Sequence, residues 1–169
     1  MYRVGQFLRA LVARVRREEL QPLSQYLTPA QMELFRRMPR YDQRHSLNVF
    51  RALRARGYDD PDLLAAALLH DAGKADEALR LWHRVIVVLA EAIEPRLLNR
   101  LAKGDPCSWR YPFFVHLCHP QRGAEMARAA GCSPTTVELI RRHHDPAGNP
   151  RRTRLDELLM ALQEIDGRS

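Results

Sequence analysis

Apolar residues recur at helical spacing along almost the whole chain, and few stretches alternate between apolar and polar residues as a half-buried strand does. Near the C-terminus, Leu155, Leu158 and Leu162 follow one another at intervals of three and four residues, which is typical of the buried face of an amphipathic helix. With 169 residues, the chain is long enough to enclose one hydrophobic core. We therefore predict an all-α helical bundle that forms a single domain.

Local signals predict where several helices begin and end. Thr28, Asp60 and Ser133 each stand directly before a proline, and an N-cap residue followed by proline is a strong helix start. Gly57 follows a helix that we expect over residues 42–56. Further helices are expected over residues 4–15, 76–94, 121–130 and 134–144, and from about Thr153 onward.

Two predictions concern the segment before Gly131. The stretch GDPCSWRYPFF, residues 104–114, is rich in turn formers and aromatic residues, so we predict a loop that shapes a binding site or covers it. His119 stands directly before Pro120, which predicts that His119 is the N-cap of the helix that Gly131 ends.

One helix is apolar on nearly every face and runs straight into two polar residues. The sequence LLAAALL, residues 63–69, continues into His70 and Asp71, and Gly73 is then expected to end the helix. A buried charge without a partner is too costly, so this pair must be hydrogen-bonded, ion-paired or bound to metal. In the simplest alternative to metal, His70 hydrogen-bonds a carbonyl group and Asp71 caps or pairs with a neighbour.

Other ionisable residues at helix ends and on inner helix faces favour the metal interpretation. His45 lies on the inner face of the helix over residues 42–56, and Asp166 continues the leucine stripe of the last helix. His143 and His144 fall in the last turn of their helix, where the helix dipole would equally well explain a protonated imidazole. Neighbouring helix residues point about 100° apart, so whether both of these histidines could hold a metal stays open.

The composition indicates which binding partners and which cellular compartment to expect. The net charge is +7 and the only lysines are Lys74 and Lys103; this suits an anionic partner such as a phosphate ester, although a general preference for arginine gives the same composition. The three cysteines lack the spacing of a zinc finger, and no segment reads as a signal peptide or a membrane span. We expect a cytoplasmic protein with no membrane partner. Nucleic acid is not expected as a partner, because no recognition motif accompanies the arginines.

Over residues 41–166 the chain resembles the HD-domain superfamily of metal-dependent phosphohydrolases. The resemblance lies in the order of the histidines and aspartates described above: His45, His70-Asp71, His119, His143-His144 and Asp166. That pattern has a histidine on a helix, an adjacent His-Asp pair and a distant aspartate. The lysine three residues after the pair, the sequence HPQRGAE and the double histidine are similar to the multi-histidine branch near HD-GYP phosphodiesterases and dinucleoside tetraphosphatases. The GYP triplet is missing, which argues against cyclic dinucleotides. Tyr41 stands where a third metal would need a carboxylate, so at most two metal ions are expected.

The resemblance implies a site, a domain layout and a reaction. Asp71 and Lys74 would be catalytic, with one or two divalent ions of Mn, Fe, Co, Ni or Zn bound by His45, His70, Asp71, His119, His143, His144 and Asp166. Lys74, Arg44, Arg84 and Arg110 would bind the substrate. Helices in residues 1–40 would pack on an HD domain over residues 41–169 that contains an insertion at about 76–112.

The expected reaction is metal-dependent hydrolysis of a phosphoester or phosphoanhydride bond in a nucleotide-like small molecule, either a nucleoside monophosphate or a dinucleoside polyphosphate. The alternative is a non-catalytic HD regulatory module that binds metal and nucleotide. Lys74 beside the His-Asp pair favours the enzyme, because a module released from catalysis has no need of it.

Overall fold

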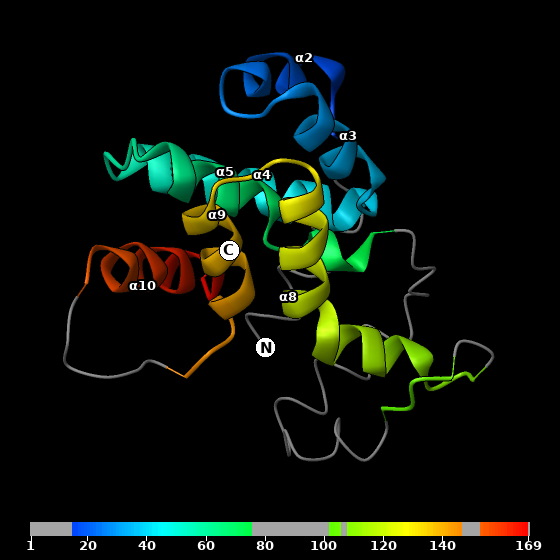
Figure 1. Cartoon of the computed structure of the whole chain (residues 1–169). Coiled ribbons are helices and arrows are strands. Elements are labelled where there is room, and N and C mark those ends of the chain that lie inside the picture. The colour runs from blue at the N-terminus through cyan, green and yellow to red at the C-terminus, as the bar shows by residue number, and fades with distance from the viewer. Residues whose placement is uncertain (1–14, 76–101, 106–107, 147–152, 169) are drawn as a thin grey trace.

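The computed structural model describes residues 15–75, 102–105, 108–146 and 153–168, and its regular structure there is entirely helical (Figure 1). The helices are α2 (Arg17–Leu20), α3 (Pro29–Arg37), α4 (Arg40–Ala55), α5 (Pro61–Leu69), α8 (Tyr111–Ala129), α9 (Pro134–Arg142) and α10 (Arg154–Asp166), with 3-10 turns η1 (Gln21–Gln25) and η2 (Ala72–Lys74). The predicted all-α fold is confirmed. The helices expected over residues 4–15 and 76–94 lie outside the described residues.

The predicted helix starts are confirmed by their capping hydrogen bonds. The side chains of Thr28 and Ser133 each accept a hydrogen bond from the backbone N–H three residues later, and Asp60 accepts from two backbone N–H groups of α5. Thr153 caps α10 in the same way as Thr28 caps α3. At the other end of α4, Gly57 has φ +86°, the left-handed conformation that glycine adopts most easily.

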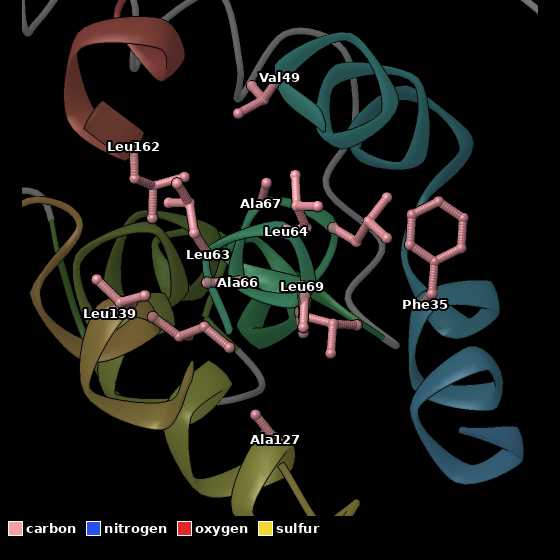
Figure 2. Close-up of a cluster of buried hydrophobic side chains, with 14 of the residues drawn as sticks. Phe35, Val49, Leu63, Leu64, Ala66, Ala67, Leu69, Ala127, Leu139 and Leu162 are labelled. Atoms are coloured by element: carbon pink, nitrogen blue, oxygen red, sulfur yellow. The ribbon is translucent and has the colours of Figure 1, made fainter. Parts of the chain in front are cut away.

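The core forms around α5, in which every residue from Leu63 to Leu69 is buried. Figure 2 shows α5 surrounded by side chains of five other helices, among them Phe35 from α3 and Val49 from α4. The others are Ala127 of α8, Leu139 of α9 and Leu162 of α10. Because α5 is enclosed by these helices, its C-terminal end opens into the interior rather than into solvent. No helix in the described ranges is long and apolar enough to span a membrane.

The predicted start of α8 was wrong. The helix begins at Tyr111, inside the segment predicted as a loop, and continues through Pro120 to Ala129, so His119 lies in the middle of a helix and is not its N-cap. Pro120 has no N–H group to donate to the carbonyl oxygen of His116, one turn earlier. Nδ1 of His119 lies 2.5 Å from that oxygen and donates to it instead. A side chain thus replaces the backbone hydrogen bond that proline removes.

The role expected of Gly73 was also wrong. In the described part of the chain only Gly57 and Gly131 have positive φ, and Gly73 lies within η2. A Cβ atom on Gly73 would lie 2.0 Å from the carbonyl oxygen of His119 and 2.8 Å from the backbone nitrogen of Gly123. This residue is glycine because η2 packs directly on the backbone of α8. The contact brings the residues after α5 against the middle of α8.

Candidate metal centre

Side chains from α4, α5, α8, α9 and α10 meet at the C-terminal end of α5. His70 is the C-cap of α5, and Asp71 follows it with φ −91° and ψ 6°, which turns the chain into η2. His143 is the C-cap of α9, and Asp166 is the last residue of α10. Three helix ends therefore point at one place. The predicted ligands brought together there are His45, His70, Asp71, His119, His143, His144 and Asp166.

The first group consists of His45, His70 and Asp166, whose ligand atoms lie within 4.8 Å of one another. Nε2 of His45 donates a hydrogen bond to Oδ1 of Asp166 across 2.6 Å. Nε2 of His70 lies 3.4 Å from the same oxygen. Two imidazoles from α4 and α5 thus face one carboxylate of α10.

The second group consists of His119, His143 and His144, whose ligand nitrogens also lie within 4.8 Å of one another. Nε2 of His119 and Nε2 of His143 are 3.2 Å apart. His119 and His143 are buried, whereas His144 is exposed. The second group therefore has one side that solvent can reach.

Asp71 lies between the two groups. Its Oδ2 is 3.8 Å from Nε2 of His70 in the first group, and its Oδ1 is 3.3 Å from Nε2 of His119 in the second. Lys74 reaches back over one turn and places Nζ 2.6 Å from Oδ1. One carboxylate thus faces both groups with different oxygens.

Three histidines are oriented by the same local hydrogen bond. Nδ1 of His70, His119 and His143 lies 3.0, 2.5 and 2.7 Å respectively from the carbonyl oxygen of the residue three positions earlier. A carbonyl oxygen only accepts, so each Nδ1 carries a proton. In a neutral ring the lone pair then lies on Nε2, the nitrogen that faces the site. The same arrangement is usual for histidines that bind metals, because the second hydrogen bond fixes the tautomer. The alternative foreseen for His70, a hydrogen bond to a carbonyl, is present and is compatible with metal binding.

Burial and neighbouring charges shift the pKa of the histidines in opposite directions in the two groups. Burial opposes a charge on His70, but the carboxylates of Asp71 and Asp166 outweigh burial and raise its pKa to about 9. Burial, together with the ammonium of Lys74, lowers the pKa of His119 to about 3. Burial and the charge of His70 likewise hold the pKa of His143 well below its usual value.

The carboxylates remain ionised despite their burial. Burial alone would raise the pKa of Asp71, but the charges of Lys74 and His70 hold it well below the usual range. The pKa of Asp166 is lowered for a similar reason, since the charge of His70 and the hydrogen bond from His45 outweigh the effect of burial.

The donor atoms fit divalent transition metals. Because His119 and His143 are neutral, the two Nε2 atoms facing each other at 3.2 Å are both acceptors, and Oδ1 of Asp71 is a third acceptor beside them. Nε2 of His70 is buried and has no hydrogen-bond partner in the described part of the chain. Buried acceptors that face one another need a donor or a cation among them, and a divalent ion can bind all of these atoms at once. Mixed imidazole and carboxylate donors suit Mn, Fe, Co, Ni or Zn better than Mg or Ca.

Comparison with known protein families agrees with this geometry. A family model described as HD domain matches residues 43–168. The chain belongs to the HD domain family. HD domains are in general metal-dependent hydrolases, and the match spans both groups and Asp71. No curated protein and no solved structure matches the chain.

The three arginines predicted to bind the substrate belong to different segments of this HD domain. The Arg44 guanidinium makes two hydrogen bonds to the carboxylate of Glu19, at 2.9 and 2.6 Å, so it ties α4 to α2. Arg110 lies in the turn directly before α8. Arg84 lies outside the described residues.

His116 is a neighbour of the site that the sequence interpretation missed. Its ring centroid is 5.6 Å from that of His119 and 6.4 Å from that of His144. The signal was present, because His116 precedes His119 by three residues, which is about one helical turn. It was missed because the helix was expected to begin only at His119, so His116 was assigned to no helix face.

Proposed function

We propose that this HD domain uses bound divalent metal ions to hydrolyse a phosphoester or phosphoanhydride bond in a nucleotide-like small molecule. The observation that supports this most directly is the meeting of three acceptor atoms, Oδ1 of Asp71 and Nε2 of His119 and His143. Such atoms repel one another, and a metal ion bound by all three would remove that repulsion. Membership of a family of metal-dependent hydrolases supports the same reading.

We infer that the two groups would each hold one ion and share Asp71. The first ion would be bound by His45, His70, Asp71 and Asp166; the second would be bound by Asp71, His119 and by His143, His144 or both. Metal ions at such a site supply Lewis acidity toward phosphoryl oxygens and a water of lowered pKa. The carbonyl groups that accept from Nδ1 keep the imidazoles in the ligating tautomer.

Lys74 is the residue that we assign to the phosphoryl group itself. Its side chain is 13% exposed, so the ammonium is partly desolvated yet can be reached from outside. A positive charge held in such a place stabilises the negative charge that develops on a phosphoryl group during hydrolysis. Arg110 stays a candidate for the remainder of the substrate. Arg44 would first have to leave Glu19, so we do not include it.

For the substrate, we propose a nucleoside monophosphate or a dinucleoside polyphosphate. Support comes from the sequence HPQRGAE around His119 and the pair His143-His144, which resemble the multi-histidine branch of the superfamily. The missing GYP triplet speaks against cyclic dinucleotides. The alternative, a regulatory module that binds metal and nucleotide without hydrolysis, would use the same ligands.

The proposal is tested with wild-type protein, Asp71→Ala and the surface control Glu164→Gln, whose carboxylate lies two residues from Asp166 and is half exposed. Metal content is measured by elemental analysis, and phosphate release is screened over phosphorylated compounds with added Mn(II). We expect metal and activity in the wild type and the control, and neither in Asp71→Ala. A metal-loaded wild type that binds nucleotides but releases no phosphate would favour the regulatory module. A wild type that binds no metal would overturn the proposal.

A further inference from the structure

We propose that the ammonium of Lys74 fills a cation position of the second group, so that the first group loads its metal ion before the second. The second ion would bind well only when Lys74 leaves Asp71. This inference rests on the metal centre of the proposed function and adds an order of loading to it.

The contacts of one oxygen atom are the first step of the argument. Oδ1 of Asp71 is 2.6 Å from Nζ of Lys74 and 3.3 Å from Nε2 of His119. An ion bound to His119 and bridged by Asp71 would have to bind this same oxygen. An ammonium and a divalent ion repel each other strongly at such short range in a buried site. The two cations therefore compete for Oδ1.

The donor sets of the two groups differ in charge. The first group contains the carboxylate of Asp166 in addition to the Oδ2 atom of Asp71 that faces it. The second group consists of histidines alone, and Asp71 faces it with Oδ1. When Lys74 neutralises Oδ1, the second group is left with neutral imidazoles, whereas the first group keeps Asp166. Competition by Lys74 therefore lowers the affinity for the second ion far more than the affinity for the first.

The backbone around Lys74 holds the residue in place but leaves the ammonium movable. The N–H of Lys74 donates to the carbonyl oxygen of Asp71 at 3.0 Å, closing the turn η2. Gly73 packs against the backbone of α8 so closely that a Cβ atom would meet the His119 carbonyl at 2.0 Å. The Cα atom of Lys74 is thus fixed, and its flexible side chain is the part that moves.

A phosphorylated compound gives the ammonium another partner. Phosphate oxygens attract Lys74 as Asp71 does, and a phosphate that takes the ammonium would release Oδ1 for the second ion. Phosphate and the second ion would then strengthen each other's binding, as two ligands linked through one group must. The substrate would in this way help to complete the centre that acts on it.

The inference is tested by titrating metal-free protein with Mn(II) while following the number and affinity of bound ions by calorimetry and electron paramagnetic resonance. Lys74→Met removes the charge and keeps much of the side-chain length, and Lys74→Gln is a second variant in case methionine disturbs the fold. The matched control is Lys103→Met, which changes the exposed second lysine of the chain. Inorganic phosphate is added in a parallel series.

In the wild type we expect one tight ion and a second that binds at least about tenfold more weakly. Lys74→Met and Lys74→Gln should tighten the second ion by about tenfold or more and give the spectrum of two coupled Mn(II) ions at lower metal concentration. Phosphate should tighten the second ion in the wild type and in Lys103→Met, but not in the Lys74 variants.

Two equally tight ions in the wild type, or unchanged affinity for the second ion in both Lys74 variants, would overturn the order of loading and leave the metal centre intact. A protein that binds no Mn(II) in any variant would overturn both this inference and the proposed function.

Discussion

The two groups of the site shift the pKa of the same residue type in opposite directions. His70 in the first group and His119 in the second are both buried, and both donate from Nδ1 to a carbonyl oxygen one turn earlier. Yet the pKa of His70 is raised to about 9, and that of His119 is lowered to about 3. Burial acts in the same direction on both. The charges of Asp71 and Asp166 outweigh burial at His70, whereas burial and the ammonium of Lys74 outweigh Asp71 at His119.

The first consequence concerns what holds the two groups together. The contact of Gly73 with α8 positions the end of α5, and with it the first group and Asp71, against His119 of the second. Gly73→Ala should therefore destabilise the protein by at least about 3 kcal/mol, because its Cβ would meet backbone atoms that have nowhere to move. It should also separate the groups and abolish binding of both ions. Urea denaturation and elemental analysis measure the two effects.

Gly131→Ala is the matched control for that substitution. Gly131 has φ +76°, but a Cβ atom there would meet nothing within 4 Å. Replacing this glycine should cost about 1 kcal/mol through backbone strain alone and leave metal binding unchanged. If both variants lost the same stability and both kept their metal, the close approach at Gly73 would not organise the site.

A substitution within one group should lower the affinity of that group for its metal ion and leave the other group unchanged. Asp166→Asn removes the carboxylate of the first group and should weaken binding of the first ion by at least about 100-fold. This loss is larger than the loss expected when only a hydrogen-bond partner of a ligand is removed. His143→Gln removes a nitrogen of the second group and should weaken the second ion by a similar factor while sparing the first. Mn(II) titrations distinguish the two. Equal weakening of both ions by either substitution would mean that the groups form one site.

The opposite pKa shifts predict that the stability of the metal-free protein is greatest near pH 6.5. His70 binds its proton more tightly when folded, so its contribution is present below pH 6.5 and is lost as the pH rises through about 9. His119 is held neutral in the fold, so its contribution is present above pH 6.5 and is lost as the pH falls toward about 3. His143 acts in the same direction as His119.

Urea midpoints measured in chelator at pH 4.5, 6.5 and 8.5 would show this maximum. His119→Gln should flatten the acid side, because glutamine does not titrate. Asp166→Asn should flatten the alkaline side, because it removes one of the charges that hold the proton on His70. A midpoint that rises steadily from pH 4.5 to pH 8.5 would contradict the shift of His70.

The features that the sequence predicted correctly depend on neighbours in the chain. Thr28, Asp60 and Ser133 cap their helices through bonds to residues two or three positions away, so a local pattern is sufficient. The all-α class follows from helical spacing in the same way. The grouping of the ligands spans five separate segments of the chain, and only the resemblance to a family could suggest it.

The features that the sequence predicted wrongly depend on contacts between distant segments. A glycine just past a helix end usually adopts positive φ, but Gly73 is needed for its contact with Gly123, fifty residues later. A proline usually marks a helix start, but α8 continues through Pro120. That second error also hid His116, because His116 and His119 were not recognised as residues of one helix.

The smallest and most local change that should affect the second group and leave the first unchanged is a substitution of Pro120. In Pro120→Ala the restored N–H would donate to the carbonyl oxygen of His116 and so compete with Nδ1 of His119, which now lies 2.5 Å from that oxygen. We expect α8 to become more stable, while the orientation of the His119 ring loosens and the second ion binds about tenfold more weakly. The first group has no contact with this hydrogen bond, so its ion should keep its affinity. If the second ion were unaffected while stability rose, the proline would have no part in orienting His119, and packing against Asp71 alone would hold the ring.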